Sequence, residues 1–189
     1  MIDDTLKQIL ADARQQMHKS LEHLAHEFNH IRTGRANPSM VEDVRVEAYG
    51  QQMPLNQVAS VGAPQSDLLV IQPWDQSTLP QIERAIMAAN LGLNPTNDGQ
   101  LIRISIPPLT EERRKELAKA VRAQGEEAKI SIRNVRRHAK DEIKKAADAE
   151  SLSEDMRYES EERLQELTDE YVGKVDTMMD KKEGDIMAV

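Results

Sequence analysis

The chain has 189 residues, of which 39% are hydrophobic and 31% charged, a composition typical of soluble globular proteins with much exposed helix. It contains no cysteine, which excludes disulfides, thiolate metal sites and a cysteine nucleophile, and no apolar run approaches the roughly 20 residues of a membrane span. The formal net charge is -8, yet residues 107–150 carry 12 basic and 9 acidic side chains, so this middle segment alone is net positive.

The N-terminal segment predicts a long amphipathic helix. Between Leu6 and Ile31 the apolar residues recur at alternating steps of three and four, which is the period of one buried helical stripe, and Gly34 is expected to end it. This opening segment is acidic and has the features of neither a secretory signal nor a transit peptide. We therefore expect a cytoplasmic protein that does not interact with membranes.

Residues 35–106 have a different pattern of residues, without the long helical period of the first segment. Short alternating or β-branched runs are punctuated by prolines, and one helical stretch has Pro80 in its first turn and Gly92 just past its end. A final strand is stopped by Pro107 and Pro108. The segment is predicted to form a compact β-rich unit with one helix.

Two further long helices follow. Thr110 is a suitable N-cap for a helix that reaches about Ala149 and would be roughly 60 Å long. Ser151 and Glu154 fit a capping box that opens the third long helix. Because three long helices with single apolar stripes need each other to bury those stripes, we expect them to form a bundle.

The predicted fold class is therefore α+β, with two domains. An elongated three-helix bundle is formed by residues 1–33 and 107–189, and a β/α/β domain of residues 35–106 is inserted after the first helix. Glycine leaves the backbone permissive whereas proline fixes φ, so the two crossing segments are expected to act as a hinge. A rigid junction closed by side chains is the alternative. The hinge candidates are Arg32, Thr33, Gly34, Arg35, Pro107 and Pro108.

Residues 26–30 read HEFNH and match the zinc motif H-E-x-x-H, in which two histidines one turn apart bind the metal. On a helical wheel His26 and His30, with His23 and Glu27, lie roughly 140° from the apolar stripe and face solvent. A catalytic zinc also needs a third protein ligand and a cleft that excludes water, and no third ligand is placed by a suitable spacing. Nucleotide-binding and hydrolase motifs are absent as well. We predict no catalytic residues, no cofactor and no metal site, although incidental metal binding by the histidines stays open.

The second long helix carries a row of cations beside its apolar seam. Most of them fall within about 60° of Lys129 on a helical wheel, with Arg137 just outside. Arginine dominates, and its planar fork suits phosphate oxygens; without interleaved aromatics, the expected target is folded nucleic acid read by its backbone. The alternative is a solvated flank that pairs with the acidic third helix. We name this row the basic stripe; it comprises Arg122, Lys129, Arg133, Arg136, Arg137, Lys140 and Lys144.

Four sequence stretches together resemble the bacterial ribosome recycling factors, in family order over essentially the whole chain. They are IRTGRANPS at 31–39, AIMAANLGLNP at 85–95, IPPLTEERRKEL at 106–117 and IRNVRR at 132–137. The resemblance implies an L-shaped molecule, hinged at two strands, that binds the post-termination ribosome in the intersubunit space with its bundle against large-subunit ribosomal RNA. It also implies that elongation factor G, using GTP, drives subunit separation, and that the chain acts as a monomer.

By position, the resemblance marks the three arginines of IRNVRR, and Arg32 at the end of the first helix, as contacts to ribosomal RNA. Together with the stripe, the RNA-binding candidates are Arg32, Arg122, Lys129, Arg133, Arg136, Arg137 and Lys140. The competing hypothesis is a helical chaperone or scaffold whose basic stripe binds an acidic protein partner.

Overall fold

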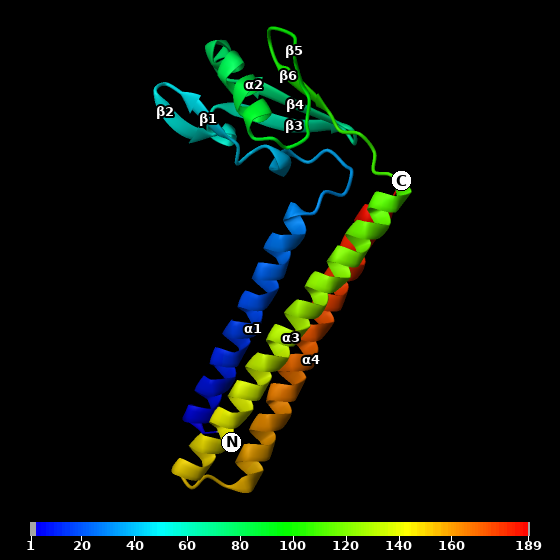
Figure 1. Ribbon diagram of the computed structural model, residues 1–189. Helices are drawn as coiled ribbons and strands as arrows, with labels where there is room; N and C mark the ends of the chain where they lie inside the picture. Colours follow the sequence, from blue (N-terminus) through cyan, green and yellow to red (C-terminus); the bar gives the residue numbers. More distant parts are fainter. Residues whose placement is uncertain (1–2, 189) are drawn as a thin grey trace. The chain divides into compact units, whose positions relative to one another are not determined.

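The computed structural model describes residues 3–188 of the chain (Figure 1). Contacts between Cα atoms divide it into two compact units. The first, which we name the helical unit, comprises Met1–Thr33 and Glu111–Val189, and the second, the β unit, comprises Gly34–Thr110. The combination of a helical unit with a unit that contains antiparallel sheets confirms the predicted α+β class.

Three helices form the helical unit: α1 (Asp4–His30), α3 (Glu111–Ala149) and α4 (Glu154–Met187). They lie side by side in Figure 1 and bury their apolar stripes in a common core, with Met17, Ile132 and Leu164 among its fully buried members. Each such side chain contributes about 1.5 to 3 kcal/mol by leaving water, so packing rather than helix propensity stabilises helices of this length. No helix within residues 3–188 is both long and apolar enough to cross a membrane.

The start of α4 differs from the predicted one. The hydroxyl of Ser153 accepts a hydrogen bond from the Met156 amide at 3.3 Å, so Ser153 is the N-cap and the capping box at Ser151 was wrong. Ser151 has a φ of 55° and lies in the turn that reverses the chain between α3 and α4. Two serines precede the same helix, and the turn places the first of them in the left-handed region, where it cannot cap.

The β unit contains two antiparallel sheets and one α-helix. Strands β1 (Arg45–Ala48) and β2 (Gln51–Pro54) form a hairpin. A second sheet has the order β3-β4-β6-β5, with β3 (Ala59–Gln65), β4 (Leu68–Pro73), β6 (Ile102–Ser105) and β5 (Pro95–Asn97). Helix α2 (Leu79–Ala88) packs against β1 and β5, and short 3-10 helices span Pro38–Met40, Leu55–Gln57 and Gln76–Thr78.

Strands β2 and β5 are the two that the sequence pattern does not predict. β2 reads QQMP and has no fully buried residue, and β5 has three residues, the first a proline, so neither shows apolar alternation. Each forms because its backbone pairs with a neighbouring strand. β2 returns along β1 through Tyr49 and Gly50, whose φ values are 53° and 73°, and β5 pairs with β6.

The β unit begins at Gly34 and ends at Thr110, whereas the predicted domain ends at residue 106. Gly34 has a φ of 77°, and a Cβ placed on it would lie 2.9 Å from the Cγ of Leu109. Both the positive φ and this close approach favour glycine over any residue with a side chain. Leu109 therefore packs where the outgoing and returning segments of the unit meet, which extends the unit past Pro107 and Pro108.

Candidate nucleic-acid interface

The basic stripe lies along the side of α3 that adjoins α4. Lys129 and Arg136 are partly buried, and the five other members are exposed. Two side chains of the stripe, Arg133 and Arg137, are four residues apart and share one face of the helix. The stripe thus has an inner edge in contact with α4, formed by Arg122, Lys129, Arg136 and Lys140. Its outer edge, formed by Arg133 and Arg137, faces solvent.

Ion pairs join the inner edge of the stripe to carboxylates of α4. Arg122 Nη2 donates to Glu183 Oε2 at 3.0 Å, and Arg122 Nε lies 2.6 Å from Oε1 of the same carboxylate. The Nζ of Lys129 lies 2.5 Å from Asp176 Oδ1, and the Nζ of Lys140 lies 3.4 Å from an oxygen of Glu161. Pairing between the basic stripe and the third long helix, which the sequence left open as an alternative, is therefore present.

Arg136 also contacts α4. Its Nη1 donates to Gln165 Oε1 at 2.9 Å, while its Nε is buried without a partner among the described residues. A side chain held in this way is not freely available to an external anion. Arg136 is therefore less available to RNA than the exposed arginines of the stripe.

Arg133 and Arg137 form the outer edge and are the arginines of the stripe that no side chain of α4 engages in the described chain. The Arg133 side chain is 44% exposed, with Nη1 3.6 Å from an oxygen of Glu126, beyond ordinary hydrogen-bond length. Arg137 is exposed, and within residues 3–188 no ion pair or hydrogen bond holds its guanidinium. Ile130, 51% exposed, lies on the same face of α3. Two guanidinium groups one turn apart can each present a planar pair of donors to phosphate oxygens.

The other predicted residues lie near the ends of the units. Arg32 lies two residues after the end of α1 and is exposed, and no described hydrogen bond or ion pair joins it to the basic stripe. Thr33 closes the first segment of the helical unit, and Gly34 and Arg35 open the β unit. The hinge candidates Pro107 and Pro108 lie in the irregular stretch after β6, inside the β unit.

His26 and His30 of the HEFNH motif are exposed on α1, whereas Phe28 of the same motif is buried in the core. The Nε2 atoms of His26 and His30 are 3.1 Å apart, and the two rings meet edge to face with their centroids 4.5 Å apart. Within residues 3–188, no group of three or more histidine, cysteine or acidic side chains is arranged to hold a metal ion. Two exposed imidazoles without a third ligand do not make the catalytic zinc site that the motif suggests.

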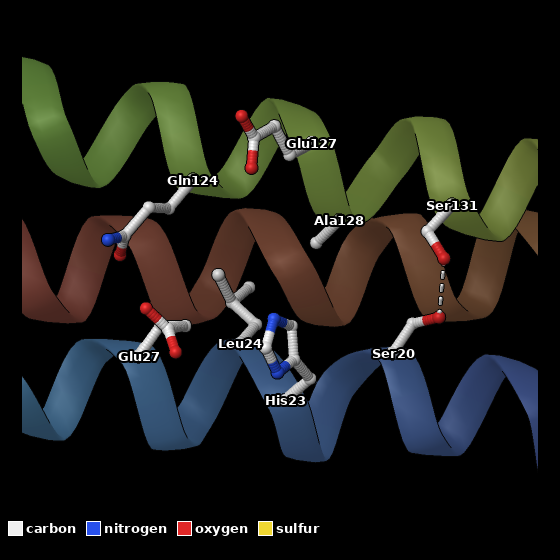
Figure 2. A pocket seen from close by; sticks show the side chains of 8 residues that line it. All are labelled: Ser20, His23, Leu24, Glu27, Gln124, Glu127, Ala128 and Ser131. Atoms are coloured by element: carbon white, nitrogen blue, oxygen red, sulfur yellow. Dashed lines mark hydrogen bonds between the residues drawn. The ribbon is translucent and has the colours of Figure 1, made fainter.

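A groove of about 280 Å³ between α1 and α3 differs chemically from the stripe (Figure 2). Glu27 and His23 extend into it from α1, and Gln124 extends from α3 (Figure 2). The hydroxyls of Ser20 and Ser131, 2.9 Å apart, bridge the two helices at one end. Since no lysine or arginine of the described chain lines the groove, it does not suit a phosphate.

No sequence motif marks the acidic side chains of α4 that meet the stripe. Asp176 and Glu183 are seven residues apart, as are Arg122 and Lys129, so antiparallel helices bring both ion pairs into register. This shared seven-residue spacing is the sequence feature that could have indicated the two ion pairs. A single helical wheel does not predict them, because the axial offset between two helices depends on how their side chains interlock in the core.

Comparisons with known proteins point to one family. A family model described as ribosome recycling factor matches residues 24–187. The ribosome-recycling factor of Salinibacter ruber is 52% identical over 189 residues, 100% of both chains, and that of Thermus thermophilus is 50% identical over 183 residues, 97% of this chain and 99% of the relative. A solution structure of a ribosome recycling factor matches with a TM-score of 0.80 at 42% identity, over 100% of both chains.

A second solved structure adds a functional setting. It is described as models for the T. thermophilus ribosome recycling factor and the E. coli elongation factor G bound to the E. coli post-termination complex. Its chain matches with a TM-score of 0.66 at 48% identity, over 100% of both chains.

Proposed function

The chain belongs to the ribosome recycling factor family, and from this premise we propose that it binds the post-termination ribosome through large-subunit ribosomal RNA in the intersubunit space. Together with elongation factor G and GTP, it promotes dissociation of the subunits so that ribosomes are reused. The related structure described with elongation factor G on a post-termination complex supports this assignment. In this proposal the chain acts in the cytoplasm as a monomeric translation factor, with neither a catalytic site nor a cofactor of its own.

The observation that carries the RNA-binding part of the proposal is the open pair Arg133 and Arg137. Both guanidinium groups are exposed and neither is closely paired in the described chain. Their i, i+4 spacing lets both approach one backbone surface. An RNA helix presents phosphates rather than base edges to side chains of this kind, so the contact would read shape and charge. Arg122, Lys129, Arg136 and Lys140 are proposed to join the contact from the inner edge, and Arg32 from the end of α1.

We further propose that the two segments connecting the units act as a hinge. Arg32 and Thr33 lead out of the helical unit, and Gly34 supplies a backbone position with a φ of 77°. The return runs through Pro107 and Pro108, where the chain lies outside helices and strands. Motion at these few residues would let the β unit move while the helical unit stays bound.

Salt dependence of ribosome binding tests the electrostatic part of this proposal. If about five phosphates are contacted, the logarithm of the binding constant should fall against the logarithm of salt concentration with a slope of about -3 to -5. Cosedimentation with ribosomes at several salt concentrations measures this slope. A slope near zero would exclude RNA phosphates as the main contact, and absence of ribosome binding at low salt would favour a chaperone or scaffold instead.

A further inference from the structure

Three carboxylates of α4 already form ion pairs with cations that the proposed function assigns to RNA binding. Glu183 binds the Arg122 guanidinium, Asp176 binds Lys129 and Glu161 binds Lys140. We name these three acids the α4 carboxylates. A carboxylate and a phosphate oxygen compete for the same N–H donors, because both are anionic acceptors of similar geometry. RNA must therefore compete with an acid of the same chain for these three cations.

The burial of these pairs distinguishes them from ordinary surface ion pairs. Side chains of Glu183 and Glu161 are 18% and 22% exposed, and that of Lys129 is 14% exposed. By contrast, Lys115 and Glu111, one turn apart on α3, are 64% and 79% exposed. Salt screens exposed pairs strongly and partly buried pairs much less. The partners of Glu183, Glu161 and Lys129, which are Arg122, Lys140 and Asp176, are 73%, 59% and 50% exposed, so each pair is half-buried and is screened by salt less than a fully exposed pair.

Resting on the proposed function, we propose that Glu161, Asp176 and Glu183 are specificity-determining residues that mask the inner edge of the basic stripe from unselective RNA. An RNA that offers only a phosphate chain meets Arg133 and Arg137, whereas contacts to Arg122, Lys129 and Lys140 must compete with the α4 carboxylates. A folded RNA surface that fits the helical unit makes enough contacts to displace them. Selectivity then arises because the carboxylates weaken the wrong complexes more than the right one.

The net charge of -8 acts in the same direction but is a separate effect. Net charge repels any polyanion at long range, to an extent that falls within a Debye length of about 8 Å at physiological salt. Masking is local and depends on which carboxylates are neutralised. Acids of α4 that form no ion pair with α3 in the described chain therefore provide a matched control.

The test compares two triple variants with equal changes in charge. The first, Glu161→Gln, Asp176→Asn and Glu183→Gln, removes the α4 carboxylates. The second, Asp155→Asn, Glu166→Gln and Asp185→Asn, removes three exposed acids of the same helix. The probes are a labelled RNA duplex of unrelated sequence, measured by fluorescence anisotropy, and intact ribosomes, measured by cosedimentation. Circular dichroism melting verifies that each variant remains folded.

We expect the first variant to bind the duplex about tenfold or more tightly than the parent chain near 0.1 M salt, with a salt slope steeper by about 2, because three cations are freed. The control variant should gain less than about threefold, by net charge alone. Ribosome affinity of the first variant should rise less than duplex affinity, so that the ratio of the two affinities falls.

Equal gains by both variants, or no gain by the first, would overturn the masking role while leaving ribosome binding by the parent chain intact. If the parent chain fails to bind ribosomes, the proposed function fails, whereas a selective gain for the duplex would still support masking. If the first triple variant unfolds, the duplex affinity of the single variant Glu183→Gln is the test instead. Its partner Arg122 is 73% exposed and contributes little to the core. A gain for Glu183→Gln above that of Glu166→Gln supports masking, and equal values contradict it.

Discussion

Reversing both charges of the outer edge, as Arg133→Glu with Arg137→Glu, should weaken ribosome binding by roughly a hundredfold or more. A hydrogen bond to a charged group contributes about 1.5 to 3 kcal/mol, so the loss of two such contacts corresponds to about 3 kcal/mol before repulsion is added. Because both side chains are exposed and neither is closely paired, the melting temperature should change little. Cosedimentation with ribosomes measures the affinity, and circular dichroism measures the melting temperature.

A variant with the same change in charge controls for net repulsion. Lys19 and Lys181 are exposed on α1 and α4, and no ion pair engages either within residues 3–188. Lys19→Glu with Lys181→Glu should lower ribosome affinity severalfold at most. Equal losses in the two double variants would show that the outer edge makes no specific contact.

Cross-linking the two connecting segments should slow subunit splitting by about tenfold or more and spare ribosome binding. The RNA-binding candidates lie in the helical unit, so a fixed junction leaves them available, whereas a moving β unit is required for splitting if the hinge proposal holds. Cysteines at Thr33 and Pro107 provide the cross-link, and the parent chain has no cysteine that could mispair. A disulfide requires Cα atoms within about 7 Å, so its formation is verified by electrophoresis without reductant.

The oxidised variant should split post-termination ribosomes about tenfold more slowly or worse, and reductant should restore the rate. Each single-cysteine variant, under the same oxidant, controls for the substitutions and for the oxidant itself. If the cross-linked and reduced chains split ribosomes at the same rate, the junction is only a connection and the hinge proposal is wrong.

Periodicity predicted the helical unit well because its helices depend on a local pattern. The apolar stripe from Leu6 onward packs into the core as expected, and the single apolar stripe expected of α3 does so through Val121, Ile132 and Ile143. A long stripe repeats its signal many times, so a single irregular position does not hide it. Helix ends carry less information, and the shift of the α4 cap from Ser151 to Ser153 followed from one turn.

The β unit and the stripe were harder to predict because their structure depends on partners distant in sequence. β5 exists through its ladder with β6, and its own three residues carry no signal. The helical wheel placed the cations of α3 on one side correctly, but it could not show that Lys129 meets Asp176 or that Arg136 meets Gln165. Those contacts need the axial register of α3 against α4, which is set by packing of the whole core. The sequence therefore identified the charged row but not which members are free.

The most direct measurement is the dissociation of post-termination ribosomes, followed by light scattering, in mixtures that contain or omit this chain, elongation factor G and GTP. The account predicts rapid separation into subunits only when all three are present, with little change when any one is left out. Ribosomes that stay intact with all three present, or that separate equally well without this chain, would contradict it.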